Sequence, residues 1–117
     1  MRMRDLRRAA WEREGGRCLI TGQALGEVDA STWELHHRVP GGMGGSRWDR
    51  DRLDNVIALL PQVHNLSPNS VHGCPAWSMP RGWLLPARER EPGSYPLLHW
   101  RHRWVFLDNE GGYVPVG

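Results

Sequence analysis

The sequence contains no lysine and only two cysteines, Cys18 and Cys74. At most one disulfide can form, which excludes a small secreted fold built on a disulfide framework. No apolar run reaches the roughly 20 residues that a membrane-spanning helix needs. The N-terminal stretch MRMRDLRRAAW is charged and has no apolar core of a signal peptide. We therefore expect no secretory signal, no membrane association and a cytoplasmic location.

The cationic residues that are present are all arginines. The chain has 117 residues, 39% hydrophobic and 24% charged, which fits a single domain with a modest core. Its 15 basic residues give a formal net charge of only +2, and seven tryptophans accompany them. Guanidinium groups bind phosphate bidentately and stack on flat rings, so this composition is compatible with nucleic-acid binding. Mutational bias in a GC-rich genome would produce the same arginine usage.

Apolar spacing predicts a helix in the first part of the chain and strands after it. A stripe formed by Met3, Leu6, Ala9 and Ala10 indicates a helix over residues 3–14, which two glycines end. A short strand entering a turn is expected over residues 18–22. Alternation of apolar and polar residues predicts another strand over residues 32–37.

The second half of the chain shows three further patterns. The apolar run 56–60 is expected to be buried, and it could form either a strand or the start of a helix. Ser67, Pro68 and Gly73 have the order of a helix N-cap, first position and stop, which predicts a helical turn over residues 67–73. Residues 104–107 and 113–116 flank a glycine-containing turn and predict a β-hairpin.

Four of the six histidines lie between positions 36 and 72, and an asparagine stands among them. His36 and His37 are adjacent and are followed by Arg-Val-Pro. Asn55 is followed nine residues later by His64, and His72 comes next. Neighbouring imidazoles suit a metal or proton-transfer site better than a core, because each ring brings nitrogens that need polar partners.

This ordered set resembles the HNH endonuclease family, whose pattern is a histidine before a nearby proline, then an asparagine and a final histidine. The stretches HHRVPGGMGGS, VHNLSPNSVHG and RWVFLDNEGGY look like the small stand-alone HNH proteins of bacteriophages and prophages. The resemblance implies one α+β domain, 1–117, with a ββα-metal core over about 17–85. An N-terminal helix would precede this core, and a C-terminal β-hairpin over about 95–117 would close it.

The implied activity is metal-dependent hydrolysis of DNA phosphodiester bonds, by nicking or double-strand cleavage, with low or short sequence preference. His37 would be the general base, since histidine with its ordinary pKa of roughly 6.5 is largely neutral near pH 7. His36 and His64 would bind the metal, with His72 as a candidate third ligand. His72 could instead be a histidine at the negative end of a helix dipole. The amide of Asn55 would bridge the loop to the histidine strand.

Further side chains are assigned supporting roles. Glu34 could orient a metal ligand. The candidates for phosphate contact are Arg38, Arg47, Arg4 and Arg8. Adjacent strand residues point to opposite faces, so His36 and His37 serve one site only if the strand ends or bends between them.

The resemblance implies one divalent ion, Mn²⁺, Ni²⁺, Co²⁺, Zn²⁺ or Mg²⁺, and imidazole ligands favour the first four over magnesium. Many HNH proteins also hold a structural zinc on two Cys-x-x-Cys pairs. Here those positions read Cys18-Leu-Ile-Thr21 and Leu60-Pro-Gln-Val63. One thiolate cannot hold a tetrahedral zinc, so we expect no structural zinc, apolar packing at the second pair and a buried Cys18.

The expected partner is double-stranded DNA, and the resemblance adds a role beside phage terminase during genome packaging. The alternative is a DNA-binding or packaging-complex module that does not cut. A third reading is an interaction module whose histidines only fill space. His99 and His102, among tryptophans and arginines on an expected strand, read as structural. Cut site, physiological metal and oligomeric state stay open.

Overall fold

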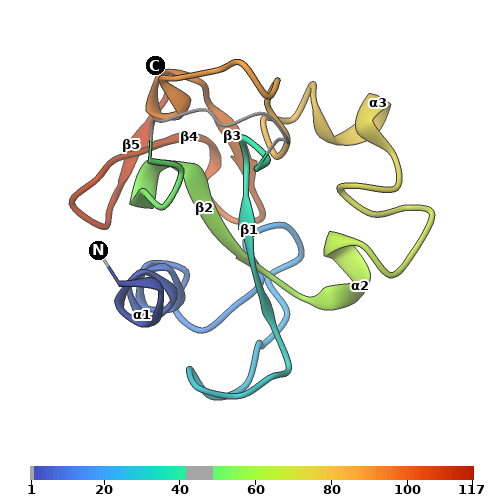
Figure 1. Ribbon diagram of the computed structural model, residues 1–117, viewed down its shortest axis with the longest axis vertical. Coiled ribbons are helices and arrows are strands. Elements are labelled where there is room, and N and C mark those ends of the chain that lie inside the picture. The colour runs from blue at the N-terminus through green and yellow to red at the C-terminus, as the bar shows by residue number, and fades with distance from the viewer. Residues whose placement is uncertain (1, 42–48) are drawn as a thin grey trace.

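A computed structural model describes residues 2–41 and 49–117 (Figure 1). Their helices are α1 (Met3–Arg13), α2 (Pro61–His64) and α3 (Pro75–Ser78), with the 3₁₀ turns η1 (Leu53–Asn55) and η2 (Pro92–Ser94). Their strands are β1 (Glu34–His37), β2 (Val56–Leu59), β3 (Leu97–His99), β4 (Arg103–Leu107) and β5 (Tyr113–Pro115). The strands form two antiparallel sheets, β1–β2 and β3–β4–β5, which confirms the α+β class. In the described part of the chain, no helix has the length and apolar character needed to span a membrane.

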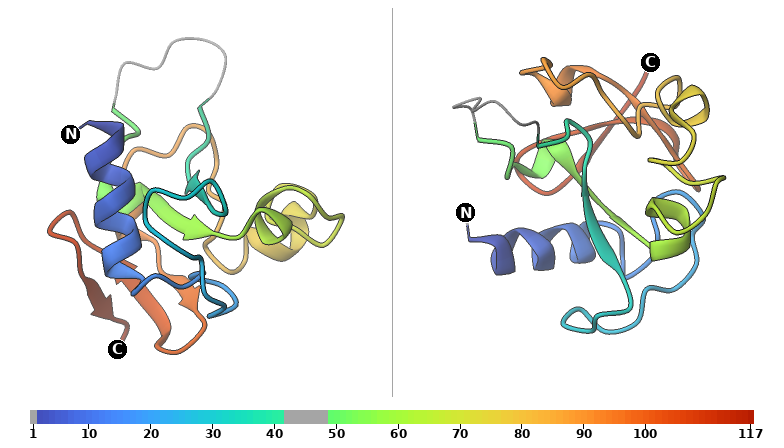
Figure 2. Two further views of the ribbon diagram at one scale, coloured as in Figure 1. Left: turned by 90° about the horizontal axis from the view of Figure 1, so that it is seen from below. Right: turned by 45° about the vertical axis from the view of Figure 1, so that its right-hand side comes forward.

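Helix α1 forms where the apolar stripe predicts it and packs across β2 (Figure 2). Leu6 and Ala10 are fully buried and share a cluster with Leu53 and Val56. The helix ends just before Gly15, whose φ of +65° lies in the left-handed region that glycine adopts at little cost.

Strands β1 and β2 carry the histidine pair. Their antiparallel register places His36 opposite Ile57 and His37 opposite Val56. All four residues of β2 are buried, so the apolar run is a strand. Helix α2 follows β2 directly and begins at Pro61, which suits a first helical position because proline lacks an N–H. The order of elements along this part of the chain is thus strand, strand, helix.

Two local predictions are wrong and one is confirmed. Residues 67–73 form turns rather than a helix, because the Ser67 hydroxyl accepts the Asn69 N–H in a local turn, as serine does in turns as well as at helix caps. Residues 18–22 form a tight turn closed by the Gly22 N–H on the Cys18 carbonyl, with only an isolated bridge between Arg17 and Ala24. The C-terminal hairpin is confirmed by antiparallel pairing of β4 with β5.

The larger core lies between the two sheets and the early turn. Cys18 is fully buried in it, as predicted, and makes no disulfide. Leu60 and Val63 are partly buried against the same core. The members of this core are Cys18, Leu19, Leu25, Trp33, Ile57, Ala58, Leu59, Val71, Trp83, Leu97, Val105 and Leu107.

A buried polar network ties α1 to both sheets. Arg13 and Glu14 form an ion pair with almost no exposed side chain, at 2.6 Å between Nε and Oε1. The Tyr113 hydroxyl donates to Glu14 Oε1 at 2.6 Å, and the Ala58 N–H donates to Oε2 at 3.0 Å. Burial, with the Glu14 charge, raises the pKa of Tyr113. These bonds compensate the cost of burying the carboxylate.

Candidate metal centre

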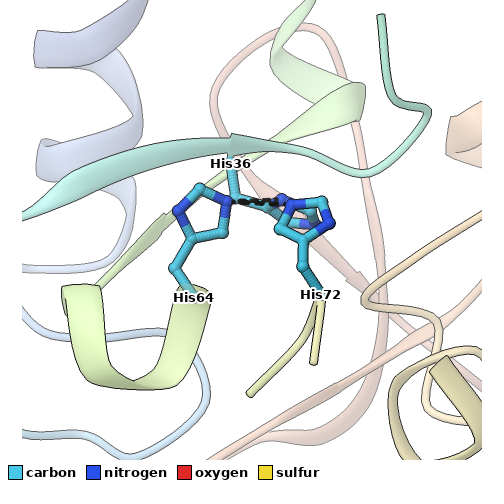
Figure 3. A group of neighbouring side chains, drawn as sticks. All are labelled: His36, His64 and His72. Carbon is cyan, nitrogen blue, oxygen red and sulfur yellow. Dashed lines mark hydrogen bonds between the residues drawn. The ribbon is translucent and has the colours of Figure 1, made fainter. Parts of the chain in front are cut away.

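Three of the predicted site histidines meet in space (Figure 3). His36 comes from β1, His64 is the last residue of α2, and His72 lies on the loop between α2 and α3. Their ring centroids are 4.8 to 4.9 Å apart, and one nitrogen from each ring lies within 4.8 Å of the others. The loop returns His72 to this position through two backbone bonds, from Val71 N–H to the Val63 carbonyl and from His72 N–H to the His64 carbonyl.

The outer nitrogens of two rings have partners that can only accept hydrogen bonds. His36 Nε2 lies 2.6 Å from the Trp83 carbonyl oxygen, and His64 Nδ1 lies 2.9 Å from Glu34 Oε1. A carbonyl and an ionised carboxylate have no proton to give, so these partners assign the proton to the outer nitrogen of each neutral ring. The inner nitrogens, His36 Nδ1 and His64 Nε2, therefore carry lone pairs.

These two lone pairs face each other at 3.1 Å. His72 Nε2 lies at the same distance, 3.1 Å, from His64 Nε2. Two lone pairs at hydrogen-bond distance with no proton between them repel, whereas a cation among them is attracted to both. Metal–nitrogen bonds of about 2.1 Å would separate two ligands by about 3.0 Å at a right angle and about 3.4 Å at the tetrahedral angle. The His36 and His64 nitrogens thus fit a metal ion in spacing and in tautomer, and His72 Nε2 lies beside them.

The electrostatics of the cluster favour neutral rings. Burial lowers the pKa of His36 well below its ordinary value; the Trp83 carbonyl opposes this, and the neighbouring His64, His72 and His37 add to the lowering. The pKa of His72 is also lowered, first by burial and then by His64. A neutral imidazole is the form that binds a metal, so little proton release is needed on binding. His36 is buried while His72 is exposed, so the cluster opens to solvent on the His72 side.

His37 lies outside this cluster. The β1–β2 register is regular through both histidines, so the strand does not bend between them and their side chains leave opposite faces. The third ring beside His36 and His64 is therefore His72 and not His37. His37 Nε2 lies 2.8 Å from Asp51 Oδ1, and about a quarter of its side chain is exposed. With its Nε2–H on this carboxylate, neutral His37 keeps a lone pair on Nδ1.

Asn55 is fully buried at the end of η1. Its Oδ1 accepts the Val39 N–H at 2.9 Å, and its Nδ2 donates to the Arg50 carbonyl at 3.0 Å. Its backbone carbonyl accepts the Arg38 N–H at 2.7 Å. These bonds connect the end of the histidine strand to the segment before η1, which is the bridging geometry expected of Asn55.

The predicted phosphate-contacting arginines have different positions. Arg38 is completely buried, and its guanidinium donates to the backbone carbonyls of Gly82, Asp54, Pro92 and Tyr95. Burial lowers its pKa to about 9, with Arg13 adding to the effect and Asp54 opposing it. The Arg38 guanidinium therefore links backbone segments inside the protein. The prediction that Arg38 contacts phosphate is wrong, because its side chain is not accessible to a ligand.

Arg4 and Arg8 are exposed on α1, with only long ion pairs of 3.7 to 3.9 Å to nearby carboxylates. Arg47 lies outside the described residues. Two other arginines have structural roles: Arg7 lies over the Trp33 ring at 3.6 Å, and Arg13 pairs with Glu14.

Sequence reasoning missed two partners of the histidines. Asp51 belongs to a run with several carboxylates, Asp49, Asp51 and Asp54, and nothing in the sequence selects one of them. The Trp83 carbonyl is a backbone atom, which no residue type reveals.

Family models, curated proteins and solved structures were each compared with the chain, and none of them matches it.

Proposed function

We propose that this protein is a metal-dependent endonuclease of the HNH type that hydrolyses DNA phosphodiester bonds. The observation that carries the proposal is the pair of inner lone pairs, His36 Nδ1 and His64 Nε2, held 3.1 Å apart with His72 beside them. A fourth histidine, His37, stands next to His36 on the same strand with a carboxylate partner. The chain order of these residues with Asn55 supports the family assignment.

His36, His64 and His72 would hold one divalent ion, with Glu34 and the Trp83 carbonyl fixing two of the rings. When bound, the ion would supply positive charge against the crowded phosphate and the departing 3′ oxygen. Three imidazoles favour Mn²⁺, Co²⁺, Ni²⁺ or Zn²⁺ over Mg²⁺, which prefers oxygen ligands. We therefore expect stronger cutting with manganese or nickel than with magnesium.

His37 would act as the general base. Its Nδ1 would take the proton of the attacking water while Asp51 holds the Nε2–H and fixes the tautomer. Asp51 is thus a positioning residue. The opposite orientation of His36 and His37 is compatible with these roles, because the water attacks the phosphate on the side away from the leaving oxygen. Asn55 would keep the loop and strand in register, and the products would carry a 5′ phosphate and a 3′ hydroxyl.

The substrate would be double-stranded DNA. Arg4 and Arg8 are available on the surface of α1 for phosphate contacts. A chain of 117 residues has few elements to spare for reading base edges, so we expect little sequence preference. A role beside phage terminase stays a prediction of the resemblance alone.

A nicking assay tests this function. Metal-stripped protein is incubated with supercoiled plasmid and Mn²⁺, Ni²⁺, Co²⁺, Zn²⁺ or Mg²⁺ in turn. We expect His37→Ala to lower the nicking rate by about 10²- to 10⁴-fold, as for loss of a general base. Arg88→Gln, which removes an exposed side chain outside the histidine cluster, is the control. A gel shift without nicking under every metal would instead show a DNA-binding module, and activity with magnesium alone would contradict the ligand assignment.

A further inference from the structure

The turn between β3 and β4 carries positive charge that the metal centre does not use. From Tyr95 to Leu107 the chain has no acidic residue, while the turn reads His-Trp-Arg-His-Arg over 99–103. Within residues 2–41 and 49–117, the side chains of Arg101 and Arg103 form no hydrogen bond or ion pair. The turn lies beside the C-terminal end of α1, because residues of both line one cavity. An unpaired cationic turn of this kind is suited to an anionic partner.

The turn borders a cavity of about 220 Å³. Arg17 and Arg101 line it together with His99 and His102. Glu14 also lines it, but that carboxylate is already bound by Arg13, the Tyr113 hydroxyl and the Ala58 N–H. The cavity therefore carries an excess of cationic groups.

The side chain of His99 adds an N–H donor to the cavity wall. Only 4% of the residue is exposed. Its Nδ1 accepts the backbone N–H groups of Arg101 and His102, at 3.0 and 3.1 Å, so the proton of the neutral ring is on Nε2. Burial, together with the charges of His102, Arg13 and Arg101, lowers its pKa to about 4. Among the described residues the Nε2–H has no oxygen or nitrogen acceptor, and the His99 ring lies beside the rings of His102 and Tyr113, with centroids 4.6 and 4.8 Å away.

The turn is held rigidly. Trp100 packs on Gly22 so closely that an added Cβ would lie 2.6 Å from the indole ring, and the Trp100 N–H donates to the Leu19 carbonyl. Arg103 has a φ of +65°, an uncommon backbone conformation for a residue with a side chain. Such costly local conformations often mark binding sites. A fixed turn loses little entropy when a ligand binds.

We propose that this cavity binds a phosphate group of the DNA backbone, at a contact separate from the metal centre. The guanidinium groups of Arg17 and Arg101 would neutralise the phosphate, and the His99 Nε2–H would donate to one of its oxygens. The choice of DNA as the source of the phosphate rests on the proposed function. The contact would fix the duplex at a second point and so orient it toward the histidine cluster.

Salt-dependent DNA binding tests the proposal with full-length protein in EDTA, so that no cleavage occurs. Arg101→Gln is compared with Arg88→Gln, which removes an exposed arginine away from the cavity. Each phosphate contact contributes about 0.9 to the slope of log K against log salt concentration. We expect Arg101→Gln to lower this slope by about one and the affinity by roughly eight-fold at 0.1 M salt. Arg88→Gln should leave both near the wild-type values.

A second arm separates DNA from free phosphate. Inorganic phosphate is titrated into the protein while the ring signals of His99 and His102 are followed by NMR. If phosphate perturbs these signals but Arg101→Gln leaves the DNA slope unchanged, the site takes a free anion and the proposal is overturned. Equal slopes for Arg101→Gln and Arg88→Gln also overturn it. A protein that shows the slope change but never nicks plasmid refutes the nuclease function and leaves this site standing.

Discussion

Replacing the exposed ligand of the histidine cluster should separate metal binding from folding. In His72→Ala the backbone bond from position 72 to the His64 carbonyl remains, and the deleted ring is exposed. The free energy of unfolding of the metal-free variant should therefore lie within about 0.5 kcal/mol of the wild-type value, as is usual for surface substitutions. His36→Ala would be a poorer test, because its ring is buried and its loss would also create a cavity.

The size of the metal effect follows from linkage. At a free metal concentration of 100 times Kd, metal binding raises the free energy of unfolding of the wild-type protein by about 2.7 kcal/mol. For a chain of this length that raises Tm by roughly 11 °C. Loss of an outer partner of a metal ligand already weakens binding by about 10- to 100-fold, so loss of a ligand should weaken it by at least about 100-fold. At the same metal concentration the variant would gain only about 0.4 kcal/mol, or roughly 2 °C.

Differential scanning fluorimetry of metal-stripped protein, with and without Ni²⁺ or Zn²⁺, measures these shifts. His102→Ala is the control, since it removes an exposed histidine outside the cluster and should keep the full shift. A His72→Ala protein that retains the wild-type shift would refute the three-histidine site. So would a wild-type protein whose Tm no divalent metal raises.

Three further predictions concern Glu34, Arg38 and His99. Glu34→Gln removes the charge that holds the Nδ1–H of His64, and calorimetry should show metal affinity about 10-fold weaker with little change in metal-free stability. Arg38→Ala leaves buried carbonyls without donors, so urea denaturation should show that the free energy of unfolding falls by about 3 kcal/mol or more. Arg4→Ala should weaken DNA binding without such a loss of stability. In the folded protein His99 has a pKa of about 4, whereas in the unfolded chain it takes up a proton near its ordinary pKa. The contribution of neutral His99 to the free energy of unfolding is therefore complete above pH 6.5 and is lost as the pH falls toward 4. Unfolding of His99→Gln should be less sensitive to pH in this window, and an equal sensitivity would refute the buried neutral state.

The elements that the sequence predicts well are those whose pattern repeats. Helix α1 follows from an apolar stripe at helical spacing, and the C-terminal hairpin from two alternating stretches around a glycine turn. The helical turn predicted at 67–73 failed because capping residues also favour plain turns, and the segment lacks an apolar face to bury. Short elements such as α2, at four residues, have too few turns to give a period.

Residue types, chain order and the resemblance they carry selected His36, His64 and His72 as candidate metal ligands, and the structure brings these three side chains close enough to hold a metal ion. Only the tertiary structure decided which nitrogen of the His36 and His64 rings faces inward, since that depends on the Trp83 carbonyl and on Glu34. It also decided that Arg38 is interior rather than on the surface, because burial is a property of what packs around a side chain and is not encoded in its own chemistry.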